Sequence, residues 1–272
     1  LLTLAGDAGA TASIALRDCR LAGAARAPNA LIRDASQTLA PALLLRDCRL
    51  ENAEGGALIR RVHPSHASDS PGWIFGDCEF RWIQYADGER AIDIRGAGAS
   101  ASLFENCSFA FQAGSGLASG VAAEDSAVEL RNCELRGEYD ADCELRLAAA
   151  YGTAEIAVRG GTFHDFDSSS EDGYGYHGWA DSDAAVRFAS CVWGPMQRAG
   201  GPGTVEPIVE GAAAFRTAQI ADGVLAVGLN DVALTPNIDL TGNALIAADH
   251  SLYLSFNGDG SAGSEAMHLG HG

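Results

Sequence analysis

The sequence predicts an all-β protein: a right-handed parallel β-helix of about seven coils, followed by a segment rich in β-hairpins. Three observations lead to this fold class. A short motif recurs at a nearly fixed period, apolar residues fall in columns with strand alternation, and a turn-forming residue occupies the same place in every copy. A fixed period of this size indicates a stacked repeat architecture.

The repeated motif is Leu-Arg-Asp-Cys-Arg-Leu, which occupies residues 16–21 and recurs unchanged at 45–50. Degenerate copies continue down the chain at intervals of 26–30 residues. The cysteine position of the seven copies is held by Cys19, Cys48, Cys78, Cys107, Cys133, Gly161 and Cys191. One motif per coil therefore predicts about seven coils over the first 200 residues.

The residue before each cysteine is predicted to form a corner. Apolar side chains stand three positions before the cysteine and two positions after it in all seven copies, so the inward alternation changes phase between them. The residue at the phase change is Asp18, Asp47, Asp77, Asn106, Asn132, Gly160 or Ser190. Because Asp, Asn and Gly tolerate the left-handed region, we expect a one-residue corner with positive φ.

A further strand is expected ahead of each motif, most clearly at 30–33, 57–60 and 91–94. About three short strands per coil describe a parallel β-helix. Leucine-rich repeats are shorter and carry a Leu-x-x-Leu-x-Leu spacing that this chain lacks, and a β-propeller needs antiparallel blades of about 40 residues or more. Both alternatives fit less well.

Six of the seven cysteines occupy the repeat column, and Cys143 lies outside it. A disulfide scaffold would show varied spacings in a smaller chain, and a metal site needs ligands in a tetrahedral arrangement. We therefore expect the column to consist of reduced, buried thiols packed between Leu and Phe. Cys143 is the one thiol expected to react quickly.

The composition limits the possible partners. Asp and Glu outnumber the basic residues 36 to 18, the net charge is −18, and every basic residue is Arg. This charge argues against nucleic acid or an anionic membrane surface as a partner. No apolar run approaches the ~18 residues of a membrane span. No polar cap precedes the first strand, so we expect the chain to be a piece of a longer protein.

The repeated hydrophobic–x–Asn–x–x–hydrophobic corner resembles the pectin-lyase-like β-helix superfamily over roughly residues 1–200. This superfamily includes polysaccharide lyases, glycoside hydrolases, bacteriophage tailspikes and inert adhesins, so the resemblance implies a fold and leaves the function open. We expect three parts: a parallel β-helix at 1–200, a connecting segment at 201–233, and a fibre-like hairpin or trimerisation segment at 234–272.

The last segment resembles the short hairpins of bacteriophage tail fibres. Alternating apolar residues at 245–256 precede the turn Asn257-Gly258-Asp259-Gly260. The resemblance implies an extracellular tail fibre or tailspike on a virion, assembled as a homotrimer with other virion tail proteins and bound to host surface polysaccharide. Any solvent-facing hairpin with an Asn-Gly turn would show a similar pattern.

The segment 164–183 interrupts the coil and combines exposed aromatic residues with carboxylates, a combination that suits sugar rings and their hydroxyls. The expected glycan contacts are Asp165, Asp167, Tyr174, Tyr176, His177 and Trp179, with Trp82 and Tyr85 as surface candidates beyond an earlier strand. Asp165, Asp167, Ser169 and Glu171 have the alternate oxygen spacing of a Ca²⁺ loop, although the rest of an EF-hand is missing. No other cofactor is expected, and a solvated acidic loop is the alternative.

No catalytic residue is identified from the sequence. Glycosidases need two carboxylates ~5–5.5 or ~6.5–9.5 Å apart. Adjacent coils of a β-helix are ~4.8 Å apart, so almost any acidic β-helix satisfies that condition somewhere. A binding or structural role is therefore favoured over an enzyme. A polysaccharide depolymerase of the same fold and a bacterial surface adhesin stay open as alternatives.

Overall fold

The structure is a computed structural model. It describes residues 2–4, 13–23, 29–34, 42–52, 56–62, 71–96, 100–164, 166–168, 173–193, 199–201 and 203–206, and beyond these the backbone of seven strands. Every regular element among these residues is a β-strand. They include no helix that is long and apolar enough to cross a membrane.

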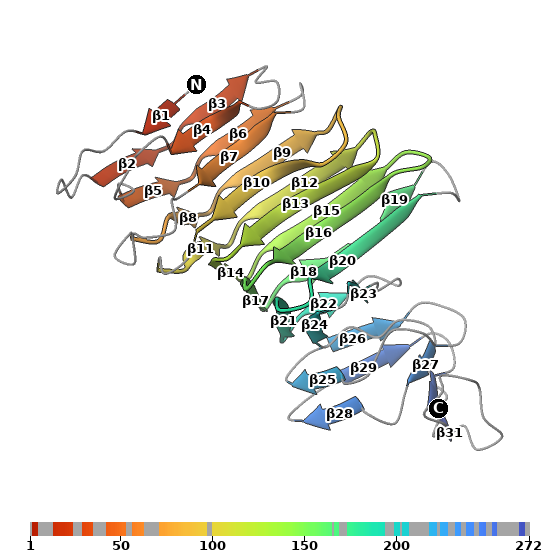
Figure 1. Ribbon diagram of the computed structural model, residues 1–272. Coiled ribbons are helices and arrows are strands. Elements are labelled where there is room, and N and C mark those ends of the chain that lie inside the picture. The colour runs from red at the N-terminus through yellow and green to blue at the C-terminus, as the bar shows by residue number, and fades with distance from the viewer. Residues whose placement is uncertain are drawn as a thin grey trace.

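The chain winds through three parallel sheets, so that each strand pairs with the strand one coil away (Figure 1). Sheet A consists of β1 (Leu2–Leu4), β4 (Ala30–Asp34), β7 (Ala57–Val62), β10 (Glu89–Arg95), β13 (Leu117–Glu124), β16 (Glu144–Tyr151), β20 (Tyr174–Ala180) and β23 (Ala199–Gly200). Sheet B consists of β2 (Ser13–Arg17), β5 (Ala42–Arg46), β8 (Ile74–Gly76), β11 (Ser102–Glu105), β14 (Ala127–Arg131), β17 (Glu155–Arg159), β21 (Ala185–Ala189) and β24 (Thr204–Glu206).

Sheet C consists of β3 (Arg20–Gly23), β6 (Arg49–Asn52), β9 (Glu79–Ile83), β12 (Ser108–Ala113), β15 (Glu134–Tyr139), β18 (Thr162–Phe163), β22 (Val192–Trp193), β26 (Val224–Val227) and β29 (Leu245–Ala248). The short strand β19 (Asp167–Ser168) also pairs with β15. The expected all-β fold is thus confirmed as a parallel β-solenoid. The predicted count of about seven coils differs slightly from the eight strands that sheets A and B each contain.

The corners have the predicted backbone conformation. The φ angles are 51° at Asp18, 53° at Asp47, 54° at Asp77, 52° at Asn106, 51° at Asn132, 66° at Gly160 and 54° at Ser190. Side chains at successive corners also touch. Asn106 Nδ2 donates to Asp77 Oδ1 at 3.2 Å, and Asn132 Nδ2 donates to Asn106 Oδ1 at 3.5 Å. The corner residues therefore both turn the chain and connect neighbouring coils.

The interior is filled by apolar side chains that stack from coil to coil. Phe75 stacks on Phe104 with ring centroids 4.5 Å apart, and Phe80 stacks on Phe109 at 4.9 Å. Trp73, which lies five residues before Cys78, is fully buried. Offset aromatic stacking adds a geometric preference to the burial of apolar area, so each ring favours the in-register position of the next coil.

Arg61 is a charged residue in this interior. Its Nη1 donates to Ser102 Oγ at 3.1 Å and its Nη2 to the carbonyl oxygen of Pro71 at 2.8 Å, while its guanidinium lies 5.5 Å from the Trp73 ring centroid. Ser102 lies five residues before its cysteine, a position that is apolar in the other six copies of the motif, and its bond to Arg61 explains the polar residue there. Burial lowers the pKa of Arg61, and the nearby Asp34 carboxylate opposes that change.

The cysteine column is buried except at its first position. Cys48, Cys78, Cys107, Cys133 and Cys191 are buried and Cys19 is half-buried, with all seven thiols free. Each column thiol donates to the carbonyl oxygen two residues earlier, as Cys78 does to Gly76 at 3.1 Å. Cys143, the thiol expected to react quickly, is buried as well, and its side chain belongs to the core cluster. This burial argues against quick reaction.

Beyond residue 206 the pairing is mainly parallel. The strand β25 (Ala218–Ala221) pairs with β28 (Ile238–Thr241), and β27 (Val232–Leu234) pairs with β30 (Leu252–Leu254), both in parallel. Among the described strands here, β30 and β31 (Met267–Leu269) form the antiparallel pair. They flank the expected Asn257-Gly258 turn, which lies outside the described residues. The division into three parts stays a prediction.

Replacing Asn106 with Val should lower the free energy of unfolding by about 1–2 kcal/mol, because a β-branched residue disfavours the left-handed region. Urea unfolding followed by circular dichroism measures this change. Asn106→Gly is the control, since it keeps the conformation and loses the contact with Asp77. Equal stability of the Val variant and the natural protein would contradict the corner assignment.

Cys107 and Cys191 should react very slowly with a thiol reagent at pH 8. The neighbouring Cys133 thiol and burial raise the pKa of Cys107 to about 12, and burial raises the pKa of Cys191 to about 12. With these pKa values both thiols stay protonated at pH 8. They therefore react slowly, because the thiolate is the reactive species. Mass spectrometry of the native protein should find Cys19 labelled first. Rapid labelling of Cys107 or Cys191 would show that the column is open.

Candidate binding surface on sheet A

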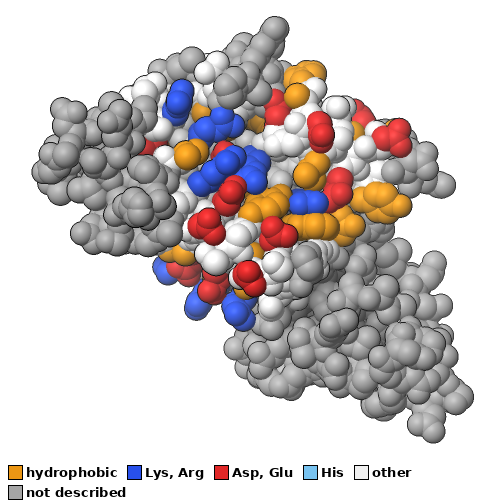
Figure 2. Space-filling model, viewed as in Figure 1, with side chains coloured by type: hydrophobic (Ala, Val, Ile, Leu, Met, Phe, Trp, Pro, Cys, Tyr) orange, Lys and Arg blue, Asp and Glu red, His pale blue; other side chains and the backbone are white. Residues whose placement is uncertain are grey.

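The outer face of sheet A carries three rows of side chains that run from coil to coil. Strand register places Arg90, Ser119, Arg146 and Tyr176 in the first row. The second row contains Arg60, Asp93, Ala122, Ala149, Trp179 and Gly200. The third row contains Arg95, Glu124 and Tyr151. The same face is turned toward the viewer in Figure 2, where arginines and apolar side chains gather.

Four of these side chains form a ladder of alternating cations and rings, here called the cation–aromatic ladder: Arg90, Tyr151, Arg146 and Trp179. The Arg90 guanidinium carbon lies 4.4 Å from the Tyr151 ring centroid. The Arg146 guanidinium carbon lies 6.0 Å from the Tyr151 centroid and 3.5 Å from the Trp179 centroid. Tyr176 meets Trp179 edge-on, with centroids 5.2 Å apart. Cations over aromatic faces attract the ring electrons, so the ladder has an energetic basis.

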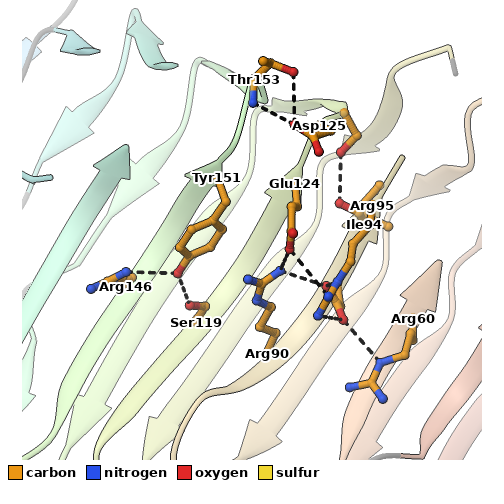
Figure 3. Close-up of polar contacts among 12 residues, drawn as sticks. Arg60, Arg90, Ile94, Arg95, Ser119, Glu124, Asp125, Arg146, Tyr151 and Thr153 are labelled. Carbon is orange, nitrogen blue, oxygen red and sulfur yellow. Dashed lines mark hydrogen bonds and ion pairs between the residues drawn. The ribbon is translucent and has the colours of Figure 1, made fainter. Parts of the chain in front are cut away.

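Hydrogen bonds fix the ladder in place (Figure 3). Arg146 Nη1 donates to the Tyr151 hydroxyl at 3.1 Å, which also lies 2.9 Å from Ser119 Oγ. Arg146 Nε donates to Glu144 Oε1 at 2.6 Å. Arg146 therefore has both its position and its orientation defined, and little conformational freedom remains for a ligand to restrict.

Small residues make room for the ladder. Ala122 and Ala149 lie in the second row and are fully buried beneath the larger side chains. Gly200 follows Trp179 in the same row, and a Cβ at Gly200 would lie only 2.6 Å from the Trp179 ring and 2.7 Å from Tyr176. Gly200 is thus required for the positions that these two rings adopt.

Next to the ladder, three arginines surround one buried carboxylate (Figure 3). Asp93 is fully buried, and Arg95 donates to it twice, with Nε–Oδ1 at 2.7 Å and Nη2–Oδ2 at 2.9 Å. Arg90 Nη1 lies 3.3 Å from Asp93 Oδ1, and Arg60 Nε lies 3.3 Å from Oδ2. Glu124 pairs with Arg90 at 2.7 Å and with Arg95 at 3.6 Å. We call these five residues the Asp93 cluster.

The structure brings two of the predicted glycan contacts onto this surface, Tyr176 and Trp179. Tyr85 and Tyr174 are exposed by 62% and 60%, as expected, and Tyr174 opens β20 while Tyr85 lies in the turn before β10. His177 points into the core and packs against Phe163 and Phe166, so its expected exposure was wrong. The reason is alternation along β20, which turns Tyr176 outward and the next residue inward.

Trp82 was expected at the surface and is buried, with 1% of its surface exposed. The motif strand β9 extends to Ile83, so its inward alternation reaches Trp82 as well. Its indole nitrogen donates to the carbonyl oxygen of Gly56 at 3.1 Å, and its ring meets Phe111 edge-on. Trp82 therefore contributes to packing between coils and is unable to contact a ligand at the surface.

The expected Ca²⁺ loop is only partly described. Asp165, Ser169 and Glu171 lie outside the described residues, while Asp167 forms part of β19 on the outer side of sheet C. The described part of the chain holds no group of three or more His, Cys, Asp or Glu side chains suited to a metal ion. The Ca²⁺ site stays a prediction.

Asp167 also borders a groove of about 620 Å³ on the outer face of sheet C. Arg81 pairs with Glu79 at 2.6 Å, and Glu134 is met by both Arg136 and His164 at 2.7 Å. These partners, Arg136 first, hold the pKa of Glu134 below its ordinary value. Glu138 and Asp167 are direct neighbours in strand register. The groove is polar and charged, and its aromatic lining residues, such as Trp82 and Phe109, are buried.

The fold and the surface define a class: a parallel β-solenoid whose one outer face carries a rigid, cation-rich layer. Comparison with protein-family models found no match, and neither did comparisons with curated proteins and with solved structures.

Sequence reasoning missed Arg90, Tyr151 and Arg146. Aligning the strand that follows each motif would have shown Arg90, Ser119, Arg146 and Tyr176 as one column.

Replacing Asp93 with Asn should lower the free energy of unfolding by about 3 kcal/mol, because three arginines lose the buried carboxylate that they share. Thermal and urea unfolding measure this. Glu129→Gln on sheet B is the matched control, since the Glu129–Arg131 pair at 2.7 Å is partly exposed and should contribute less than about 1 kcal/mol. Equal effects of the two substitutions would show that Asp93 has no special structural role.

Proposed function

We propose that this protein is the receptor-binding part of a virion tail fibre or tailspike, and that the outer face of sheet A binds host surface polysaccharide. The observation that supports the proposal is the cation–aromatic ladder. It places half-buried ring surfaces, guanidinium groups and a tyrosine hydroxyl side by side on one outer face. These are the groups that contact sugar C–H bonds and sugar hydroxyls.

The ladder has donors to offer to a sugar. Arg carries five N–H donors. Among the described residues, Arg146 uses its Nε and Nη1 and Arg90 uses its Nη1. Arg90 keeps 18% of its side chain exposed and Arg146 only 10%, so the remaining N–H groups of Arg90 are the better placed for a ligand. Because the side chains are already held by internal hydrogen bonds, binding requires little ordering of the protein.

The length of the ladder indicates an oligosaccharide ligand. The strands β10, β13, β16 and β20 are neighbours in sheet A, so the ladder spans three strand spacings, or ~14 Å. A single sugar ring covers only part of that length. A polysaccharide chain that follows the solenoid axis could contact the whole ladder. The fibre-like pattern in the C-terminal segment suggests that such chains come from the host surface.

The assembly that we propose is a homotrimer on an extracellular virion, joined to other tail proteins. Three identical faces would bind a polysaccharide at several points, and the effective concentration of the second and third sites would raise the overall affinity. A weak single site is thus compatible with firm attachment. Light scattering of a preparation that includes the C-terminal segment tests the trimer, and a monomer at micromolar concentration would contradict it.

Trp179→Ala should reduce adsorption to host cells by roughly tenfold or more, since it removes both a ring surface and the support of Arg146. Gly200→Ala should reduce adsorption less, by displacing the rings without removing them. Tyr85→Ala is the control, because it removes an exposed ring that is outside the ladder. Unchanged adsorption of the Trp179 variant, with its melting temperature unchanged, would place the receptor site elsewhere.

A depolymerase is the second function that a specific observation supports. The groove on sheet C holds two neighbouring carboxylates, Glu138 and Asp167, on adjacent parallel strands. Strand spacing sets their backbones ~4.8 Å apart, as for any two acids on adjacent strands, and the groove beside them is what distinguishes this pair. Release of reducing ends from host polysaccharide, abolished in Glu138→Gln and Asp167→Asn, would establish this activity. Release that persists in both variants would exclude this pair.

A further inference from the structure

We propose that the ligand of sheet A is an acidic polysaccharide, whose carboxylate, sulfate or phosphate groups bind at the Asp93 cluster beside the cation–aromatic ladder. The inference rests on the proposed function and adds the chemical class of the ligand. Its starting point is a contrast of charge. The chain carries a net charge of −18, yet three guanidinium groups gather around two carboxylates on this one face.

The cluster is part of the same continuous surface as the ladder. Arg90 belongs to both, because it lies over the Tyr151 ring and also contacts Asp93 and Glu124. Arg95, Glu124 and Tyr151 follow one another in the third row. From β7 to β20 the combined surface covers four strand spacings, or ~19 Å. A ligand on the ladder therefore extends over the arginines.

The charges in the cluster leave an excess of cations. Asp93 and Glu124 supply two negative charges to the three arginines. Glu89 also faces Arg60, and its Oε2 accepts the backbone N–H groups of Tyr85 and Ala86, at 3.2 and 3.3 Å. With Glu89 counted, three carboxylates face these arginines, and Arg33, the neighbour of Arg60 in strand register, raises the number of cations to four. An anionic group that arrived from solvent would meet a net positive site.

The buried carboxylate prepares the arginines for an anion. Asp93 fixes Arg95 through two hydrogen bonds along one edge, and Nη1, on the other edge, lies 3.6 Å from Glu124 Oε2. The planar fork of Arg suits bidentate contact with carboxylate, sulfate and phosphate oxygens. Each arginine is also partly exposed, with 38% of the Arg95 side chain and 18% of the Arg90 side chain accessible. The cluster thus combines accessibility with fixed orientation.

The test measures binding of the whole protein to an array of immobilised bacterial surface polysaccharides, both acidic and neutral. We expect binding to the acidic members only, with an affinity that falls steeply as NaCl rises from 50 to 500 mM, because salt screens exposed charges. Arg95→Gln should weaken binding roughly tenfold, the loss expected for one charge-assisted contact. Arg131→Gln on sheet B, a substitution of equal charge at similar exposure, should leave binding unchanged.

The outcomes separate the two proposals. Equal binding to neutral polysaccharides, or affinity that salt leaves unchanged, would overturn the acidic ligand and leave glycan binding standing. Absence of binding to every polysaccharide would overturn both. If Arg95→Gln lowers the melting temperature, Arg95→Lys replaces it as the test variant, because it keeps the charge. The salt dependence of binding is measured on the natural protein and is independent of any variant. Equal losses in the Arg95 and Arg131 variants would show only an effect of net charge.

Discussion

The left-handed corner before each cysteine is the constraint on which the rest of the structure depends. A strand that continued past the corner without a change of phase would turn its next apolar residue outward. One residue with φ near 50° redirects the chain, so that the side chains on both sides of the corner point into the same core. Asp and Asn adopt this conformation at a small cost and add a side chain that reaches the next corner. The stacked phenylalanines, the cysteine column and the three sheets all follow from this repeated turn.

Stacking in register also produces the proposed binding surface on sheet A. Each outward position of a strand lies beside the same position one coil away, so a row of outward side chains is a set of residues about one repeat apart. Arg90, Arg146 and Tyr176 are distant in the sequence and neighbours in a row. Gly200 matters as much as the large side chains, because a Cβ at this position would push the Trp179 and Tyr176 rings out of place.

The fold could be predicted from the sequence because its signal is repeated in each copy of the motif. Seven copies of the motif each predict the same corner, so the pattern is still recognised when one copy departs from it. The site gives no such repetition. Trp82 and His177 were expected at the surface because the motif strand was taken to end early and the loop 164–183 was taken to be irregular. In both places the inward alternation of a strand continues, which buries one side chain and exposes the next. Burial of a single residue depends on where a strand ends, and strand ends carry the weakest signal in a sequence.

The contacts on sheet A give a physical reason why the basic residues there are Arg and not Lys. A lysine at the position of Arg146 could donate to Glu144, but it has no planar group to stack on Trp179 while also donating to the Tyr151 hydroxyl. A lysine in place of Arg95 would bind Asp93 through one point charge and would leave its orientation open. The guanidinium group satisfies the buried carboxylate along one edge and presents further donors along another. The same property lets one side chain hold the surface together and still present further donors, which is what the proposed ligand site requires.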